Sequence, residues 1–600
     1  MSVARIYKVG SPYNAVELAD LDYAQAFDIV YLAHIDHDPT KLVRSSHTSW
    51  EFVTVPIGPT IAEPTGLNVT ATVANTDTAN SGNAYFPQPA SYVVTAINDD
   101  TGQESRASTA DSATNDLTLK RNKNVLTWAA PTGASRYRVY KAYNEQMYGF
   151  IGETESTTFT DDNIGPDLTD APPQAFNPFE DGNNPSSVTF FEQRLIWART
   201  RAVPNGVYSS RSADFENMDA ARPVREDDSI VFRILSQKVN AVNSFVPLKD
   251  LLALTSNGIF TIKGSNTDYL AANPPPRALP ENEDNVSRLK PIVVNNVAFY
   301  APEGGGEIHT AGFAFEIDGY QANDVTIFSP GLFRSYQIDG WAYARNPLSV
   351  LWVARSDGKM PTFTWQREQQ VWGWTLCETD GTVEDVCAIK EGGETRLYLL
   401  VLRTIGGVER RFVERMASAE WDQAENSCFL DCALTYQPET PTSRFQVPHL
   451  AGATVDALAD GFVIRGLTVD ANGWVDVGQD VERVVTIGLP YEALIETLPL
   501  VFQTQQGWSR DKRQMLGDIV VQVTDTRLGG VETGRRLSKM YAMKARTNEP
   551  LGSPTALFTG TASASTEPVT AGEATLFIRS AEPLPLTVTA VYLDPVVSET

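Results

Sequence analysis

The chain has 600 residues, enough for about three to five domains of ordinary size. Hydrophobic residues make up 42% and charged residues 20%, which is a globular composition rather than a disordered one. The 74 acidic and 48 basic residues leave a formal charge of −26, which disfavours binding of nucleic acid or anionic membranes through bulk charge.

Targeting signals are not visible. The sequence has no apolar run of about 18 residues, so we expect no membrane-spanning helix. The N-terminal segment lacks the apolar core and small-residue cleavage site of a secretory signal. Four cysteines are too few for a disulfide scaffold, so we expect a reducing compartment.

Short alternating or apolar runs, rich in Val and Thr and separated by turns, recur along the chain and predict a mainly β protein. Two segments favour helices instead, Ala15–Ala26 and, more weakly, Tyr491–Leu498. Hairpin turns are expected where Asn or Asp precedes Gly, because these pairs tolerate the positive φ of such turns. The predicted strands are Ser91–Ala96, Ser229–Leu235, Leu248–Thr255, Val350–Ala354, Leu397–Leu402 and Asp518–Thr524, and the turns are Asn257-Gly258, Asp357-Gly358, Asp380-Gly381 and Asn472-Gly473.

Composition shifts divide the chain into four predicted regions. Residues 1–58 form an N-terminal segment with a helix candidate and two or three strands, and residues 59–173 contain about seven short strands, the size of an immunoglobulin-like sandwich. The second region resembles a fibronectin type III module, with Trp128 and Tyr140 placed as core aromatics. Residues 174–421 form a continuous series of predicted strands and residues 422–600 a C-terminal β-rich region with different strand spacing, a pattern typical of sandwiches, barrels or a propeller.

Ordered blocks along the chain are typical of one protein family. They occur in an N-terminal, a middle and a C-terminal set, which together span about residues 11–595. The blocks are Pro12-Tyr13, Leu18, Asp20-Leu21, Ala24-Gln25, Asp28–Leu32, His34, Pro39, Leu42, Arg44 and Trp50; Ser187–Trp197, Gly206–Phe215, Asp227–Ile230, Leu248–Thr255, Gly258–Phe260, Leu351–Val353, Val371–Trp374, Val401–Arg403 and Arg411–Arg415; and His449–Gly452, Val455, Asp460-Gly461, Gly488–Tyr491, Leu498 and Pro499.

This ordered set resembles the tail nozzle (tail tubular) proteins of short-tailed bacteriophages. The resemblance implies a propeller-centred subunit of a homo-oligomeric ring, commonly a hexamer, at the distal end of the virion tail, assembled in the host cytoplasm. It implies that residues 1–58 contribute to the propeller, that residues 174–421 form the β-propeller region, and that residues 422–600 are part propeller and part nozzle wall. It also implies an adapter or upstream tail protein, tail fibre or spike proteins, and viral DNA that passes through the lumen at genome ejection. Relatives carry strands upstream of Pro12-Tyr13, so we expect another polypeptide to supply them or the propeller to close differently.

Metal-like and thiol patterns are sparse. His34-x-x-His37, with Asp36 and Asp38, has ligand types in proximity, but a polar turn that ends a strand before Pro39 is the favoured interpretation. The four cysteines, Cys377, Cys387, Cys428 and Cys432, lack zinc-knuckle spacing and are expected to be buried, with the first two on successive strands. Asp470–Gly473 only begins like a calcium loop, and Thr468–Trp474 misses the Asp-box pattern of sialidase propellers, so a tight turn is predicted.

Paired carboxylates and aromatics could serve a propeller hydrolase or a sugar shelf. Adjacent acids on one strand face opposite ways, so solvated turns are favoured for Asp161-Asp162 and Asp227-Asp228. Trp365, Trp372 and Trp374 are expected in the propeller core. We predict no catalytic, cofactor-binding or metal site, no cofactor, and no enzymatic activity.

A passive conduit is the favoured function: an acidic channel wall would repel phosphates and let DNA slide. Candidate gate loops are Gly304–Gly306, Gly529-Gly530 and Thr561–Gly572, although ordinary hairpin tips are favoured for each. The alternative is a tail adhesin or glycan-binding module that presents the fibronectin-like domain.

Overall fold

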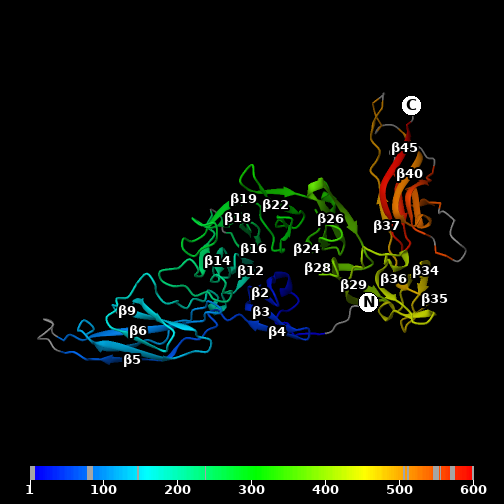
Figure 1. The fold of residues 1–600 in the computed structure, drawn as a ribbon. Helices are drawn as coiled ribbons and strands as arrows, with labels where there is room; N and C mark the ends of the chain where they lie inside the picture. The colour runs from blue at the N-terminus through cyan, green and yellow to red at the C-terminus, as the bar shows by residue number, and fades with distance from the viewer. Residues whose placement is uncertain are drawn as a thin grey trace. The chain divides into compact units, whose positions relative to one another are not determined.

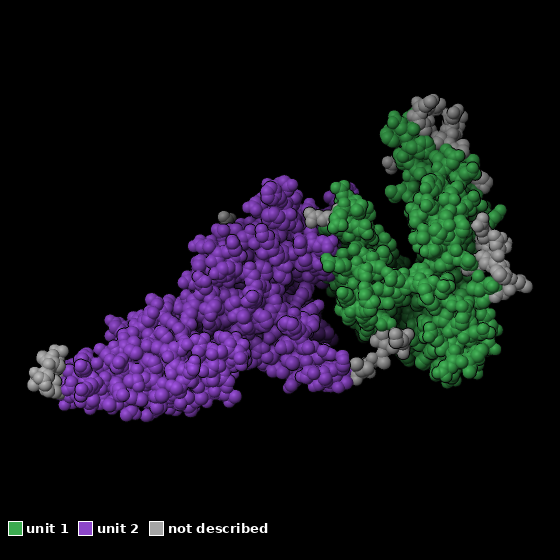
Figure 2. Space-filling model, in the orientation of Figure 1, with its two compact units in different colours: residues 1–4, 335–600 green, residues 5–334 purple. Residues whose placement is uncertain are grey.

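The computed structural model describes residues 7–76, 85–144, 147–236, 238, 240–504, 507–509, 513–544, 553–554, 556–567 and 575–597. The chain divides into two compact units: an N-terminal unit, residues 5–334, and a C-terminal unit that contains Ser335–Thr600. They are purple and green in Figure 2. Within the described residues there is no α-helix, only short 3₁₀ turns, and none of these could cross a membrane. The turns are η1 (Glu17–Asp20), η2 (Glu180–Gly182), η3 (Pro330–Leu332), η4 (Arg367–Gln369), η5 (Ala424–Asn426), η6 (Pro448–Leu450) and η8 (Leu528–Gly530).

Four antiparallel four-stranded meanders build most of the N-terminal unit (Figure 1). In each, the strands lie in sequence order, which is the blade pattern of a β-propeller. The first sheet precedes the sandwich insert and the other three follow it. They are β1 (Asp22–Ala26), β2 (Ile29–His34), β3 (His37–Ser46) and β4 (Ser49–Thr54); β12 (Pro185–Phe191), β13 (Arg194–Thr200), β14 (Gly206–Ser209) and β15 (Ile230–Arg233); β16 (Val242–Pro247), β17 (Leu251–Thr255), β18 (Gly258–Lys263) and β19 (Arg277–Asn282); and β20 (Ile292–Val294), β21 (Val297–Tyr300), β22 (His309–Ala314) and β23 (Gly319–Asp324).

Consecutive sheets pack through apolar faces. On β17, Leu251 and Ala253 join the core shared with the sheet before it, whereas Leu252 and Leu254 join the core shared with the sheet after it. Side chains alternate along a strand, so a continuous apolar run buries both faces. The sheet of β1–β4 likewise packs on that of β12–β15, through Tyr31 and Trp197.

The insert is a two-sheet sandwich, with sheet orders β10-β9-β6-β7 and β11-β8-β5. Trp128 and Tyr140 are both buried there, as predicted, and Trp128 contributes to the core between the sheets. Its strands are β5 (Thr65–Thr72), β6 (Gln88–Ile97), β7 (Asp111–Asn115), β8 (Lys123–Ala129), β9 (Arg136–Tyr143), β10 (Met147–Thr154) and β11 (Thr158–Asp161).

The C-terminal unit begins with a four-stranded and a three-stranded sheet that share one core. A mixed-order sheet with a two-stranded ribbon follows, and then a final pair of sheets around a separate core. The strands are β24 (Ile338–Ala344), β25 (Val350–Arg355), β26 (Met360–Gln366) and β27 (Val371–Cys377); β28 (Thr382–Glu391), β29 (Glu394–Ile405) and β30 (Val408–Arg415); β31 (Asp431–Tyr436), β32 (Thr442–Gln446), β33 (Thr454–Ala459), β34 (Phe462–Thr468), β35 (Trp474–Val481) and β36 (Val485–Leu489); and β37 (Ala493–Glu496), β38 (Gln503–Thr504), β39 (Gly507–Trp508), β40 (Gln514–Thr526), β41 (Val531–Arg536), β42 (Lys539–Ala542), β43 (Phe558–Ala564), β44 (Phe577–Ser580) and β45 (Thr587–Val597).

The mainly β, propeller-centred fold class is therefore confirmed, but both helix predictions are wrong. The segment Ala15–Ala26 forms η1 and then β1, which pairs antiparallel with β2 from Asp22↔Ala33 to Ala26↔Ile29. Tyr491–Leu498 contains β37, paired with β44. In both segments pairing with a neighbouring strand overrides local helix propensity.

Two of the four predicted hairpin turns are correct. Asn257-Gly258 joins β17 to β18, and a Cβ on Gly258 would lie 2.9 Å from the carbonyl oxygen of Asn282, so the turn requires glycine. Asp357-Gly358 joins β25 to β26. Asp380-Gly381 and Asn472-Gly473 are not hairpins, because the strands on either side of each belong to different sheets.

Candidate functional site

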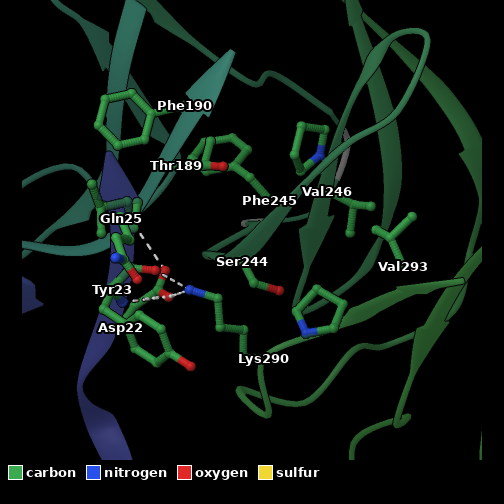
Figure 3. Close-up of a pocket in the computed structure, with 14 residues that line it drawn as sticks. Asp22, Tyr23, Gln25, Thr189, Phe190, Ser244, Phe245, Val246, Lys290 and Val293 are labelled. Carbon is green, nitrogen blue, oxygen red and sulfur yellow. Dashed lines mark hydrogen bonds and ion pairs between the residues drawn. The ribbon is translucent and has the colours of Figure 1, made fainter. Parts of the chain in front are cut away.

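A cavity of about 320 Å³ in the N-terminal unit is lined by β1, β12, β16 and the segment that leads into and includes the start of β20 (Figure 3). We call it the inner-strand cavity, because these are the first strands of their four sheets. Its wall is mainly apolar, with Phe190 and Phe245 among the largest side chains. The volume is at the lower end of the range of about 300–1,000 Å³ for small-molecule pockets, which is the size of a small ligand and not of duplex DNA.

One ion pair crosses this cavity. The Nζ of Lys290 lies 2.9 Å from Oδ1 of Asp22 and 3.9 Å from the centroid of the Tyr23 ring. The other carboxylate oxygen of Asp22 accepts hydrogen bonds from the Ser187 hydroxyl and the Val188 backbone N–H, at 3.0 and 2.9 Å. Asp22 therefore ties β1 to β12, and its charge is already satisfied rather than available for acid–base chemistry.

Ser244 also lines the cavity, but unlike Asp22 its side chain ties no strands together. Its side chain is 3% exposed, and its Oγ has no hydrogen-bond partner within the described residues. A buried unpaired hydroxyl is costly unless water or a ligand satisfies it. Neither Lys290 nor Ser244 was singled out from the sequence, because only the folding of β16 and β20 onto the same cavity relates them.

His34 ends β2 and His37 begins β3, so the two histidines flank the turn between these strands. The rings of His34 and His37 are 5.1 Å apart, and Nε2 of His37 lies 3.0 Å from a carboxylate oxygen of Glu17. Burial lowers the pKa of His34, which favours its neutral form. Asp36 turns away to pair with Arg201.

The adjacent carboxylates do not form an open acid pair, and the expectation that they lie in solvated turns is wrong for one member of each pair. Asp161 is buried, accepts a hydrogen bond from Tyr92 and pairs with Lys141. Asp228 is buried and accepts hydrogen bonds from the backbone N–H groups of Ala221 and Arg225. Loops with many polar backbone groups recruit these carboxylates as internal acceptors.

All four cysteines are free thiols. Cys377 ends β27 and Cys387 lies on β28, on successive strands as predicted. Only partial burial is observed, and Cys387 is exposed, so the expectation that all four are buried is wrong. Burial, followed by the charge of Glu414, raises the pKa of Cys432 to about 12, so this thiol is protonated at neutral pH.

The Asp470 segment is the tight turn that was predicted. The Asp470 side chain accepts hydrogen bonds from the backbone N–H groups of Asn472 and Trp474, at 2.8 Å each. The oxygen that a calcium ion would need is thus used inside the turn.

The tryptophans are not core residues. Trp365 and Trp372 are cross-strand partners on β26 and β27, and Trp372 is 57% exposed because β27 is the edge strand of its sheet. Trp374 stacks on Phe363 with ring centroids 4.6 Å apart.

The three predicted gate loops adopt different structures. Gly304 and Gly305 adopt positive φ in a turn before β22. Gly529-Gly530 belongs to η8. Thr561–Ala564 is not a loop but the end of β43, and residues 568–572 of that segment lie outside the described residues.

Within the described residues, one group of side chains has a spacing that could hold a metal ion: Glu307, His309 and Asp324. His309 begins β22, Asp324 ends β23 and Glu307 lies two residues before β22; the group was not predicted. The only sequence signal is Glu307-x-His309, which places two ligand types on one side of an extended chain.

No family model and no curated protein matches the sequence. Among solved structures, a candidate 6-phosphogluconolactonase from Bacteroides uniformis matches 55% of this chain and 96% of its own, with 9% identity and a TM-score of 0.25. A chain in the complex of Kap60 with yeast RCC1 (Prp20) matches 60% of this chain and 84% of its own, with 10% identity and a TM-score of 0.24. TM-scores of this size support no inference about fold or function.

Proposed function

We propose that the protein is a structural subunit of a bacteriophage tail nozzle, which assembles with copies of itself into a ring through which the genome leaves the virion. The proposal rests on the ordered blocks that resemble tail nozzle proteins and on the propeller-centred fold. In this role the chain catalyses no reaction, and its partners are the upstream tail protein, the fibres or spikes, and DNA that slides without sequence readout.

The observation that carries the proposal is an apolar hairpin tip between β22 and β23. Phe315 is 87% exposed and Ile317 is 63% exposed, and Phe313 at the end of β22 is also exposed. Clustered exposed apolar side chains mark interaction surfaces, since water is a poor environment for them. A second copy of the chain is the partner that a ring requires.

The inner-strand cavity supports a channel between copies rather than through one propeller. It is narrow, apolar in most of its wall and crossed by the Asp22–Lys290 ion pair. In a ring, the formal charge of −26 per chain would favour an acidic lumen, with an effect limited to about 8–10 Å from the wall at physiological salt.

Mass photometry of the purified chain tests the proposal. We expect a ring-sized species for the wild type and a shift to monomer when Phe315→Asp and Ile317→Asp are combined, since charges would have to be buried at the interface. Thr48→Asp, which adds a charge at the exposed β3–β4 turn, is the control and should leave the rings intact. Rings that survive the double substitution would contradict this interface.

The adhesin alternative is supported by one observation, the exposed indole of Trp372 on edge strand β27. Exposed aromatic rings can stack on apolar sugar faces. Glycan-array binding by the full chain that is lost in Trp372→Ala would favour this function, whereas absence of glycan binding by the wild type would remove it.

A further inference from the structure

The cluster on β22 and β23 joins an imidazole to three carboxylates. His309 and Asp324 are directly paired across these strands, and Glu307 lies two residues before His309. Ligand atoms of Glu307, His309 and Asp324 all lie within 4.8 Å of one another. The third acidic side chain, Asp284, lies beside the Nδ1 nitrogen of the imidazole.

The two ring nitrogens of His309 have different surroundings. Nδ1 lies 3.0 Å from Oδ2 of Asp284, and Nε2 lies 3.3 Å from Oε2 of Glu307. The same Asp284 oxygen accepts a hydrogen bond from the hydroxyl of Tyr300. In the tautomer in which Nδ1 donates to Asp284, the lone pair is on Nε2, on the side of Glu307.

This arrangement is the carboxylate–histidine pattern found around protein-bound metals, in which an outer carboxylate orients the imidazole and increases its basicity. Asp324 is oriented too, because its Oδ1 accepts hydrogen bonds from the backbone N–H and hydroxyl of Thr326, at 2.7 and 2.6 Å.

Charge is the second observation. Within the described part of the chain, no Lys or Arg forms an ion pair with Asp284, Glu307 or Asp324, and His309 is their one cationic candidate. Three carboxylates around one imidazole leave negative charge uncompensated even when the imidazole is protonated. A divalent cation would neutralise it.

We propose that Glu307, His309 and Asp324 bind a divalent transition-metal ion of the zinc class, with Asp284 as the positioning residue on His309. One imidazole nitrogen and two carboxylates suit Zn²⁺ or Co²⁺ better than Ca²⁺ or Mg²⁺, which prefer oxygen ligands throughout. Glu307 is 56% exposed, so water completes the coordination on that side.

The site has a structural consequence. Glu307 directly follows Gly304–Gly306, whose first two residues have positive φ, and Asp324 ends β23. A bound ion ties the glycine turn to the edge strand of the sheet and restrains the segment that enters β22.

The test is metal binding by the full chain after removal of metals with a chelator. We expect one Zn²⁺ per chain by isothermal titration calorimetry. Bound Co²⁺ should give a visible absorption spectrum, and an excess of Mg²⁺ should not displace the Co²⁺. His309→Ala should abolish the Co²⁺ spectrum. Glu307→Gln changes an exposed side chain and should fold normally, so its expected affinity loss of at least about tenfold separates ligation from misfolding.

The matched control is His37→Ala, which removes the other histidine close to a glutamate and should leave the affinity unchanged. Asp284→Asn should weaken binding by about 10–100-fold and alter the Co²⁺ spectrum, a change that a merely structural role would not produce. The proposal is overturned if the wild type binds no Zn²⁺ saturably, if His309→Ala and Glu307→Gln both bind normally, or if only His37→Ala loses binding.

Discussion

The two kinds of junction in the N-terminal unit differ in chemistry. Consecutive sheets of the propeller meet through apolar cores, such as the one that contains Tyr31, Leu195 and Trp197. The sandwich insert instead meets the loop between β14 and β15 through ion pairs and hydrogen bonds. We call these the sheet junctions and the insert junction.

The insert junction is a set of charged contacts. Arg106 of the insert makes two hydrogen bonds to Asp219, at 2.8 and 3.0 Å, which raise the pKa of Arg106. Arg225 pairs with Glu104 and with Asp170, and Gln103 donates to Asp214. Burial alone would lower the pKa of Arg225, but the two carboxylates outweigh it and raise this pKa.

The difference between the two junctions separates two roles. The apolar sheet junctions hold the propeller sheets together, and the charged insert junction attaches the sandwich insert to them. Apolar burial contributes about 25 cal/mol per Å² and is not weakened by electrostatic screening, whereas partly exposed ion pairs contribute little and are screened by salt. We expect the sheets to unfold as one unit and the insert to be held in place more weakly.

The largest expected effect comes from breaking a sheet junction. Trp197→Ala should lower the free energy of unfolding by about 3–5 kcal/mol, because it leaves a cavity beside Tyr31 and Phe179. Differential scanning calorimetry measures the loss. Phe27→Ala, at an exposed side chain of the β1–β2 turn, should change stability by less than about 0.5 kcal/mol. Equal losses in the two variants would contradict the importance of the sheet junction.

A smaller effect is expected at the insert junction. Asp219→Asn removes the charge opposite Arg106, which keeps contact with water, so we expect a loss of about 1–2 kcal/mol. Limited proteolysis should cut the entry to the insert, around Gly58, faster than in the wild type. Asp99→Asn, which breaks the exposed pair with Arg136, is the control and should leave the cleavage rate unchanged.

An ion pair inside the loop between β14 and β15 gives a pH-dependent test of the charged contacts of this region. Burial alone would raise the pKa of Asp227, but Arg211 outweighs it and leaves this pKa below 3.8. The pair therefore stabilises the fold above pH 3.8, and this contribution is lost as the pH falls through the lowered pKa. Asp227→Asn should cost up to about 1 kcal/mol at neutral pH and nothing at the acid end, as measured by urea unfolding. A difference that does not depend on pH would contradict the ion-pair interpretation.

The smallest expected effect is that of salt. At about 1 M NaCl the screening length falls to about 3 Å, which should loosen the insert junction and leave the sheet junctions unchanged. The rate of backbone amide hydrogen exchange should rise by less than about threefold in residues 210–229 and should stay constant in β17. A parallel rise in both regions would indicate a general loss of stability instead.

The sequence patterns predicted correctly those turns and strands that depend on a few neighbouring residues. Asn257-Gly258 is a hairpin because Gly258 must approach the Asn282 carbonyl closely, and the apolar runs are strands because both of their faces are buried. Asp380-Gly381 has the same turn chemistry, but it leads from one sheet to the next, which only the order of the sheets decides.

Long-range placement explains the remaining errors. The segment that contains β1 has helix-forming residues but lies beside Ile29–Ala33, and Asp228 has charged neighbours but is buried by its own loop. The His309 site joins positions 284, 307, 309 and 324, so the Glu307-x-His309 spacing alone could not predict it.

The most direct test of the nozzle proposal is negative-stain imaging of virions labelled with an antibody against the chain, beside images of the purified protein. We predict label at the distal end of the tail and purified rings with an axial hole. A protein that stays monomeric and is absent from the tail axis would contradict the proposal.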